Sequence, residues 1–104
     1  MSELKTITAQ EVQQKLEAGE TLHLIDVRED DEVAEGMIPE AKHIAMGDVA
    51  MHLDDLDQEN EYILICRSGK RSENVGWFLH DHGYKVVNMT GGMIEYSGET
   101  NPKR

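Results

Sequence analysis

The chain has 104 residues, a formal net charge of −11 and a hydrophobic content of 38%. This length is that of one ordinary domain, so a cleft between two domains is not expected. The charge argues against nucleic acid as a partner, because counterion release requires a basic surface. No stretch approaches the roughly 20 apolar residues that span a bilayer, and no basic N-terminal region precedes an apolar run. We therefore expect a cytoplasmic globular protein that binds neither nucleic acid nor a membrane.

The first third of the chain predicts a helix, a buried strand and a short acidic helix. Thr8 and Glu11 form a capping-box pattern, which indicates a helix that ends before Gly19. Residues 22–27 form a short, mostly apolar run that is typical of a strand covered on both faces. Residues 30–35 fit one or two acidic helical turns.

The remainder of the chain alternates apolar runs with helical patterns. The clearest feature is the apolar run 62–65, which ends at Cys66 and is followed by a helical pattern over 71–82. The other expected elements are a short strand at 43–46, a short helix at 47–56, a strand at 85–89 and a last helical segment at 93–96.

Strands that alternate with helices at this spacing indicate parallel pairing and right-handed crossovers. We therefore expect a three-layer α/β/α sandwich with a mostly parallel central sheet. A single domain is expected over residues 1–96, with residues 97–104 as a flexible, solvated C-terminal tail. In such folds the functional site lies beyond the carboxyl ends of the strands, which is where Cys66 falls.

Cys66 is the only cysteine of the chain, which excludes a disulfide within it. At the end of a buried strand a lone cysteine is as often an inert small hydrophobe as a nucleophile. Here the loop that follows enters a helix, so backbone N–H groups can turn toward the sulfur as an anion-binding nest. The helix N-terminus and the nearby Arg67, Lys70 and Arg71 should lower the pKa of the thiol. A thiolate would then form without a histidine base.

The loop residues suit the binding of a small anion, although a turn of this composition is most often an ordinary solvated loop. Gly69 permits a tight curl and a close approach of the amides to a ligand. Arg71 supplies a planar fork suited to an oxyanion such as a sulfonate. The hydroxyl groups of Ser68 and Ser72 are candidate donors to the sulfur, but helix capping is a sufficient explanation for at least one of them.

The stretch 66–72 has a cysteine, two residues, a glycine, one residue, an arginine and a small hydroxyl residue. It resembles the active-site loop of rhodanese-like sulfurtransferases. The stretch 24–41 is similar to the early strand-and-turn signature of that family, and 91–93 is similar to its closing motif. The resemblance runs from about Ile7 to Tyr96. It departs from the family pattern, outside the active loop, at Met37, Glu40 and Tyr96.

The resemblance implies a two-step sulfur transfer. Cys66 would attack the sulfane sulfur of a donor such as thiosulfate, release sulfite, and pass the bound sulfur to cyanide or a thiol. The loop amides would hold the outer sulfur, and the basic side chains of the loop would attract the anionic donor. Because the chain has one cysteine, the acceptor must be external: cyanide, a small thiol or the cysteine of a partner protein. We assign Cys66 as the catalytic residue, and as substrate-binding residues Arg67, Ser68, Gly69, Lys70 and Arg71.

This chemistry needs no metal or organic cofactor. His80 and His82 are two positions apart on a predicted helix and so point to different faces, which argues against a shared metal. Asp26 and Arg28 follow a buried strand and are secondary candidates, with Ser72, for orienting the loop or the substrate. An ion pair in a surface turn explains the first two equally well, although the family resemblance favours packing of Asp26 against the loop.

Two other functions share Cys66. A phosphatase or arsenate reductase also uses a cysteine and an arginine around an amide-lined loop, but its pattern places five residues between them. Four residues separate Cys66 from Arg71 here, and the shorter cradle suits one sulfur atom better than a tetrahedral oxyanion. The second alternative is a sulfur-relay or partner-binding module with little free turnover, which the motifs do not distinguish from an enzyme.

Overall fold

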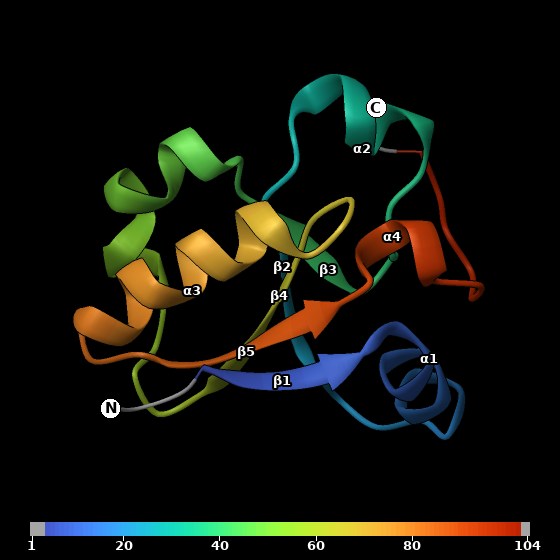
Figure 1. The fold of residues 1–104 in the computed structure, drawn as a ribbon, viewed down its shortest axis with the longest axis horizontal. Helices are drawn as coiled ribbons and strands as arrows, with labels where there is room; N and C mark the ends of the chain where they lie inside the picture. Colours follow the sequence, from blue (N-terminus) through green and yellow to red (C-terminus); the bar gives the residue numbers. More distant parts are fainter. Residues whose placement is uncertain (1–3, 103–104) are drawn as a thin grey trace.

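A computed structural model describes residues 4–102 of the chain. Its centre is a five-stranded sheet with the strand order β1-β5-β4-β2-β3, in which every neighbouring pair is parallel (Figure 1). The strands are β1 (Lys5–Thr8), β2 (His23–Asp26), β3 (Ala41–His43), β4 (Glu61–Ile65) and β5 (Lys85–Thr90). The helices are α1 (Ala9–Glu17), α2 (Asp30–Glu35), the 3-10 helix η1 (Met46–Asp55), α3 (Lys70–Asp81) and α4 (Gly92–Glu95).

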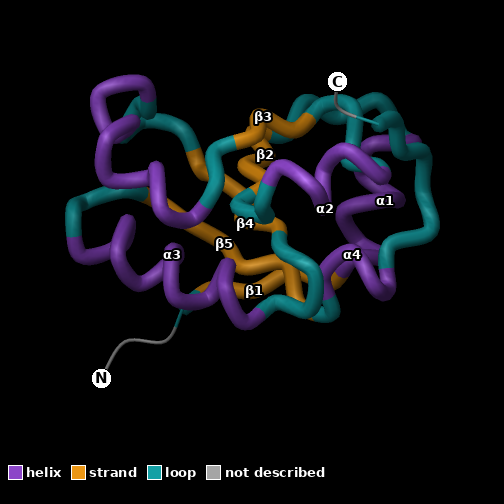
Figure 2. Tube along the Cα trace, turned by 90° about the horizontal axis from the view of Figure 1, so that it is seen from above, coloured by secondary structure: helices purple, strands orange, loops and turns teal. Residues whose placement is uncertain are grey.

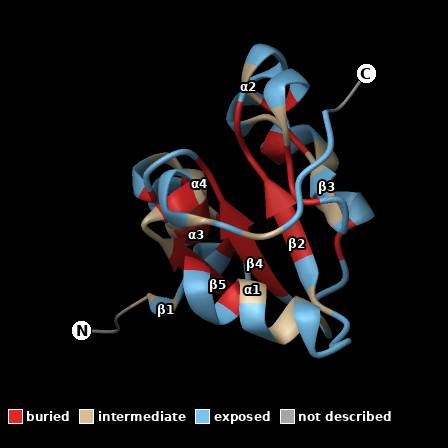
Figure 3. Cartoon of the chain, turned by 90° about the vertical axis from the view of Figure 1, so that its right-hand side faces the viewer, coloured by how far each residue is buried: buried red, intermediate tan, exposed pale blue. Residues whose placement is uncertain are grey.

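Helices cover both faces of the sheet, which confirms the predicted three-layer α/β/α sandwich. Figure 2 shows α3 and η1 on one side of the strands and α1 and α4 on the other. Side chains alternate between the faces of a strand. On β4, Ile63 and Ile65 therefore join the apolar cluster beneath α1, whereas Leu64 joins the cluster beneath α3, as does Cys66, which follows the strand. Figure 3 shows the buried strands enclosed by helices whose outer faces are exposed.

The chain connections create a crevice at the carboxyl ends of β2 and β4. These two strands are neighbours, and Asp26 pairs in register with Ile65. From β2 the chain passes through α2 to β3, and from β4 it passes through α3 to β5, so the two connections leave in opposite directions. Parallel sheets bind ligands at such switch points. Cys66 follows β4 at this position, as the sequence predicts.

The first strand, β1, is absent from the sequence-based prediction. It is an edge strand in which only Ile7 is partly buried, so it lacks the apolar run that signals a central strand. The strand expected at 43–46 lies instead at Ala41–His43, and the helix expected at 47–56 is the 3-10 helix Met46–Asp55. The capping box is confirmed, because Thr8 and Glu11 exchange side-chain and backbone hydrogen bonds.

The C-terminal segment, which the sequence analysis expects to be a flexible and solvated tail, makes a backbone contact with the rest of the domain. Its side chains are mostly exposed, but the backbone of Asn101 exchanges two hydrogen bonds with Met37, of 2.8 and 2.9 Å. This antiparallel bridge holds the described part of the segment beside α2, and residues 103–104 lie outside the described range. Within residues 4–102, no helix is both long and apolar enough to cross a membrane.

Candidate active site

The sulfur of Cys66 lies inside the loop that joins β4 to α3. The side chain is fully buried, and its Sγ accepts a hydrogen bond of 2.9 Å from the backbone N–H of Gly69. The Ser72 hydroxyl lies 3.3 Å from the same sulfur. Gly69 has a φ of 99°, a left-handed conformation that a residue with a Cβ rarely adopts. The glycine therefore allows the loop to turn its amides toward the sulfur.

Hydrogen bonds to the sulfur favour the thiolate. Burial raises the pKa of the Cys66 thiol. The hydrogen bonds from the Ser72 side chain and from the backbone N–H groups of Ser72, Gly69 and Ser68 lower it, and together they outweigh the effect of burial. The pKa of the thiol consequently lies below its ordinary value, in the direction that the sequence predicts. The causes that lower it are hydrogen bonds within the loop, whereas the sequence analysis named the helix N-terminus and the nearby basic side chains.

The start of α4 fixes the orientation of the loop peptides. The Met93 N–H donates to the Cys66 carbonyl at 2.9 Å, and the Ile94 N–H donates to the Arg67 carbonyl at 3.1 Å. In a trans peptide the C=O and N–H groups point in opposite directions. Holding these two carbonyls against α4 therefore turns the following N–H groups toward the interior of the loop.

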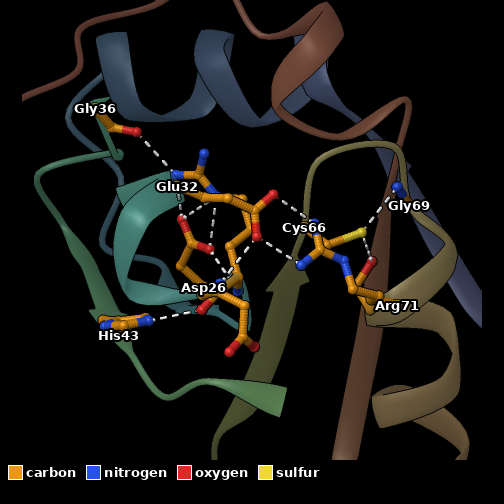
Figure 4. A network of polar contacts seen from close by, with 10 residues as sticks. Asp26, Glu32, Gly36, His43, Cys66, Gly69 and Arg71 are labelled. Atoms are coloured by element: carbon orange, nitrogen blue, oxygen red, sulfur yellow. Dashed lines mark hydrogen bonds and ion pairs between the residues drawn. The ribbon is translucent and has the colours of Figure 1, made fainter. Parts of the chain in front are cut away.

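The guanidinium of Arg71 is paired with a carboxylate in the structure. It donates two hydrogen bonds, of 2.6 and 2.7 Å, to the carboxylate of Glu32 on α2 (Figure 4). The hydrogen bonds from Arg71 lower the pKa of Glu32 to about 2, even though burial raises it. The pair thus bridges the crevice from α2 to α3, and an oxyanion that binds Arg71 must compete with Glu32.

Asp26 and Arg28 form the local ion pair of the alternative interpretation, but the pair is buried and does not lie in a surface turn. Asp26 is fully buried and accepts hydrogen bonds of 2.8 to 3.1 Å from the Arg28 guanidinium. The guanidinium also donates to the Gly36 carbonyl at 2.8 Å. Asp26 thus neutralises Arg28, and Arg28 in turn connects the end of β2 to Gly36, the residue that follows α2.

An open groove of about 650 Å³ adjoins the loop, between α2 and the segment that contains α4. Arg28, Glu32 and Glu35 line one part of it, and Arg67 and the exposed Ile94 line another. Among residues 4–102, the exposed Arg67 and Lys70 have no ion-pair partner, so they are the loop cations available to an incoming anion. No group of three or more potential metal ligands is gathered in that part of the chain.

Asn88 is a site residue that the sequence analysis missed. It lies on β5, is 5% exposed, and its Oδ1 accepts a 2.5 Å hydrogen bond from the Ser72 hydroxyl. Its Nδ2 donates to the Gly69 carbonyl at 3.0 Å. The sequence contains one signal for its role, a polar residue within the apolar run 85–89, because a buried polar group needs a hydrogen-bond partner.

Known proteins are similar to this chain in both sequence and fold. The family model of the rhodanese-like domain matches residues 8–99. The chain belongs to the rhodanese-like family. It is 54% identical over 101 residues to the "Putative sulfurtransferase YtwF" of Bacillus subtilis (strain 168), and the match covers 97% of this chain and 98% of that protein.

Two further comparisons extend the rhodanese-like assignment. The chain is 34% identical over 100 residues to the "Putative sulfur carrier protein YrkF" of the same strain, covering 95% of this chain but only 54% of that protein. A rhodanese-like domain protein from Staphylococcus aureus has the same fold, with a TM-score of 0.90 and 34% identity, over 97% of this chain and all of that one. This rhodanese-like chain is thus similar in sequence and fold to proteins that include a putative sulfurtransferase.

Proposed function

We propose that the protein transfers sulfur by carrying it as a persulfide on Cys66. The observation that supports this function best is the position of Sγ, which is surrounded by the donors of the active loop. The 2.9 Å hydrogen bond from the backbone N–H of Gly69 to Sγ supports the stabilisation of an anionic sulfur in this loop. The same amides are placed to hold the outer sulfur of a persulfide.

With thiosulfate as the donor, the proposed reaction has two steps. The Cys66 thiolate attacks the outer sulfur, the sulfur–sulfur bond of the donor breaks, and sulfite leaves with the bonding electron pair. An external nucleophile, either cyanide or a thiolate, then attacks the outer sulfur of the persulfide, and the Cys66 thiolate is the leaving group. Arg67 and Lys70 attract the dianionic donor against the negative charge of the protein.

A sulfur relay is a second candidate, and the Arg71–Glu32 pair favours it. Since Glu32 occupies the guanidinium fork, a small oxyanion donor has to displace a carboxylate. A persulfide on a partner protein carries no sulfonate and does not need that fork. The similarity to a protein whose name describes a sulfur carrier supports the same proposal.

Sulfur loading from two donors tests the proposal. The protein is incubated with thiosulfate or with a persulfidated donor protein, and its intact mass is measured before and after addition of cyanide or a small thiol. The expected result is a gain of one sulfur atom, which the acceptor removes. Cys66→Ser is the matched control and should gain nothing.

The ratio of the two loading rates separates the candidates. Rapid loading from thiosulfate with repeated turnover to cyanide supports a free enzyme, whereas faster loading from the donor protein supports a relay. If neither donor adds sulfur to the wild-type protein, the proposed function is wrong.

A further inference from the structure

The hydroxyl group of Ser72 lies between two acceptors. Its Oγ is 2.5 Å from Oδ1 of Asn88 and 3.3 Å from Sγ of Cys66. A serine hydroxyl has one proton, so it cannot donate to both acceptors at once. The shorter contact assigns the proton to Asn88 while Cys66 is a thiol, and Ser72 then presents a lone pair toward the sulfur.

The side-chain orientation of Asn88 is set by its second contact. Its Nδ2 donates to the Gly69 carbonyl at 3.0 Å, and exchanging the amide oxygen and nitrogen would place two oxygens against each other. Oδ1 must therefore face Ser72. Asn88 and Ser72 are both buried, so neither has ready access to bulk water as a substitute partner.

We propose that Asn88 is a positioning residue, which holds the Ser72 proton away from Cys66 until the thiolate forms and the proton turns from Oδ1 to the sulfur. Ionisation releases the thiol proton to solvent, and the Ser72 hydroxyl rotates about its Cβ–Oγ bond to stabilise the negative sulfur. Asn88 Oδ1 loses its donor in this state. Once a persulfide forms, the negative charge lies on the outer sulfur, and the hydroxyl proton returns to Asn88.

Removing Asn88 should change the pKa of Cys66 in one direction if Asn88 holds the Ser72 proton, and in the other if it only supports the loop. The inference rests on the proposed function of Cys66 as the reacting group. If Asn88 competes for the Ser72 proton, its removal frees that proton for the thiolate and lowers the pKa of Cys66. If Asn88 only supports the loop through Gly69, its removal disturbs the N–H donors and raises that pKa.

The Asn88→Val variant tests the sign. The thiolate is titrated by its ultraviolet absorbance, with the corresponding Cys66→Ser protein as the blank. One neutral hydrogen bond contributes about 0.5–1.5 kcal/mol, so we expect the midpoint to fall by roughly half to one pH unit. In a Ser72→Ala background the same Asn88 substitution should leave the midpoint unchanged, because the rotating hydroxyl is absent.

The charged groups around Cys66 are the same in wild type, Asn88→Val, Ser72→Ala and the double variant, which together form a double-mutant cycle. Arg71 of α3, which acts electrostatically on the sulfur, stays paired with Glu32 of α2. Arg67 and Lys70 of the loop are also retained, while α4 meets Cys66 through a backbone N–H. A difference between the midpoints therefore measures the contribution of Asn88 through Ser72.

A measurement on wild-type protein keeps the test valid if Asn88→Val fails to fold. The side-chain amide NMR signals of Asn88 should shift with the same midpoint as Cys66 in the wild type, and should stay constant through this range in Ser72→Ala. A raised midpoint in Asn88→Val, or wild-type Asn88 signals that do not titrate, would overturn the inference. The titration uses no sulfur donor, so these results are independent of whether sulfur transfer occurs.

Discussion

Replacing Glu32 with glutamine should make thiosulfate a better donor. Glutamine retains the size of the side chain but removes the charge that occupies the Arg71 fork. The pKa of Glu32 is lowered from 4.5 to about 2, chiefly by its hydrogen bonds with Arg71, and each unit corresponds to about 1.4 kcal/mol, so the net stabilisation of the carboxylate is roughly 3.5 kcal/mol before screening. The Glu32 and Arg71 side chains are 24% and 31% exposed, and solvent screening reduces the value to about 1–2 kcal/mol.

This energy sets the expected change in kinetics. If thiosulfate must displace Glu32 from Arg71, removing the carboxylate should lower the thiosulfate concentration for half-maximal loading by roughly 5- to 30-fold. The assay measures the rate of Cys66 persulfidation against thiosulfate concentration in a single turnover, by intact mass. Glu35→Gln is the matched control, because Glu35 is exposed on the same helix and lines the same groove without holding Arg71.

Stability measurements separate this effect from damage to the fold. The lowered pKa of Glu32 means that the pair stabilises the folded state above about pH 4.5, and that this contribution is lost as the pH falls toward 2. Glu32→Gln should therefore be about 1–2 kcal/mol less stable than wild type at neutral pH, and the difference should vanish at low pH. Equal half-loading concentrations in wild type, Glu32→Gln and Glu35→Gln would refute the competition between Glu32 and thiosulfate.

Two further substitutions test the support of the loop. A Cβ at Gly92, where φ is 58°, would lie 2.7 Å from the Cys66 carbonyl oxygen. Gly92→Ala should therefore displace α4 from the loop and slow persulfidation by about tenfold or more. Loading at the wild-type rate would contradict the role of α4 in orienting the loop peptides. Asp26→Asn leaves the buried Arg28 without its counter-charge and should lower the free energy of unfolding, measured in urea, by about 3–5 kcal/mol. A decrease below about 1 kcal/mol would show that the ion pair contributes little.

The active loop was predictable because its information is local. Cys66 to Ser72 are contiguous, and a cysteine at a strand end followed by Gly69 and a helix specifies the turn and the direction of its amides. The strands β2, β4 and β5 were predictable for a similar reason, since each contains adjacent buried apolar residues.

The partners of the loop were not predictable, because they depend on tertiary packing. Arg71 and Glu32 are 39 positions apart and meet only because α2 and α3 flank the same crevice. Sequence reasoning consequently assigned the Arg71 fork to the substrate. The Ser72–Asn88 contact likewise joins α3 to β5, and the only sequence signal was one polar residue in a buried strand.

The short edge strands were missed or misplaced for a different reason. In β1 only Ile7 is partly buried, and β3 has three residues of which none is fully buried. These strands are defined by pairing with a neighbour, Thr6 with Asn88 and Lys42 with Ile25, and leave no periodic pattern in the chain.

We expect Cys66 itself to carry the transferred sulfur. After incubation with thiosulfate or a persulfidated donor, the protein is alkylated, digested and analysed by mass spectrometry of the peptide that contains Cys66. The expected product is an alkylated persulfide on Cys66, which prior treatment with cyanide or a thiol removes and which Cys66→Ser lacks. A Cys66 peptide that never gains sulfur from any sulfane donor, in protein shown to be folded, would contradict it.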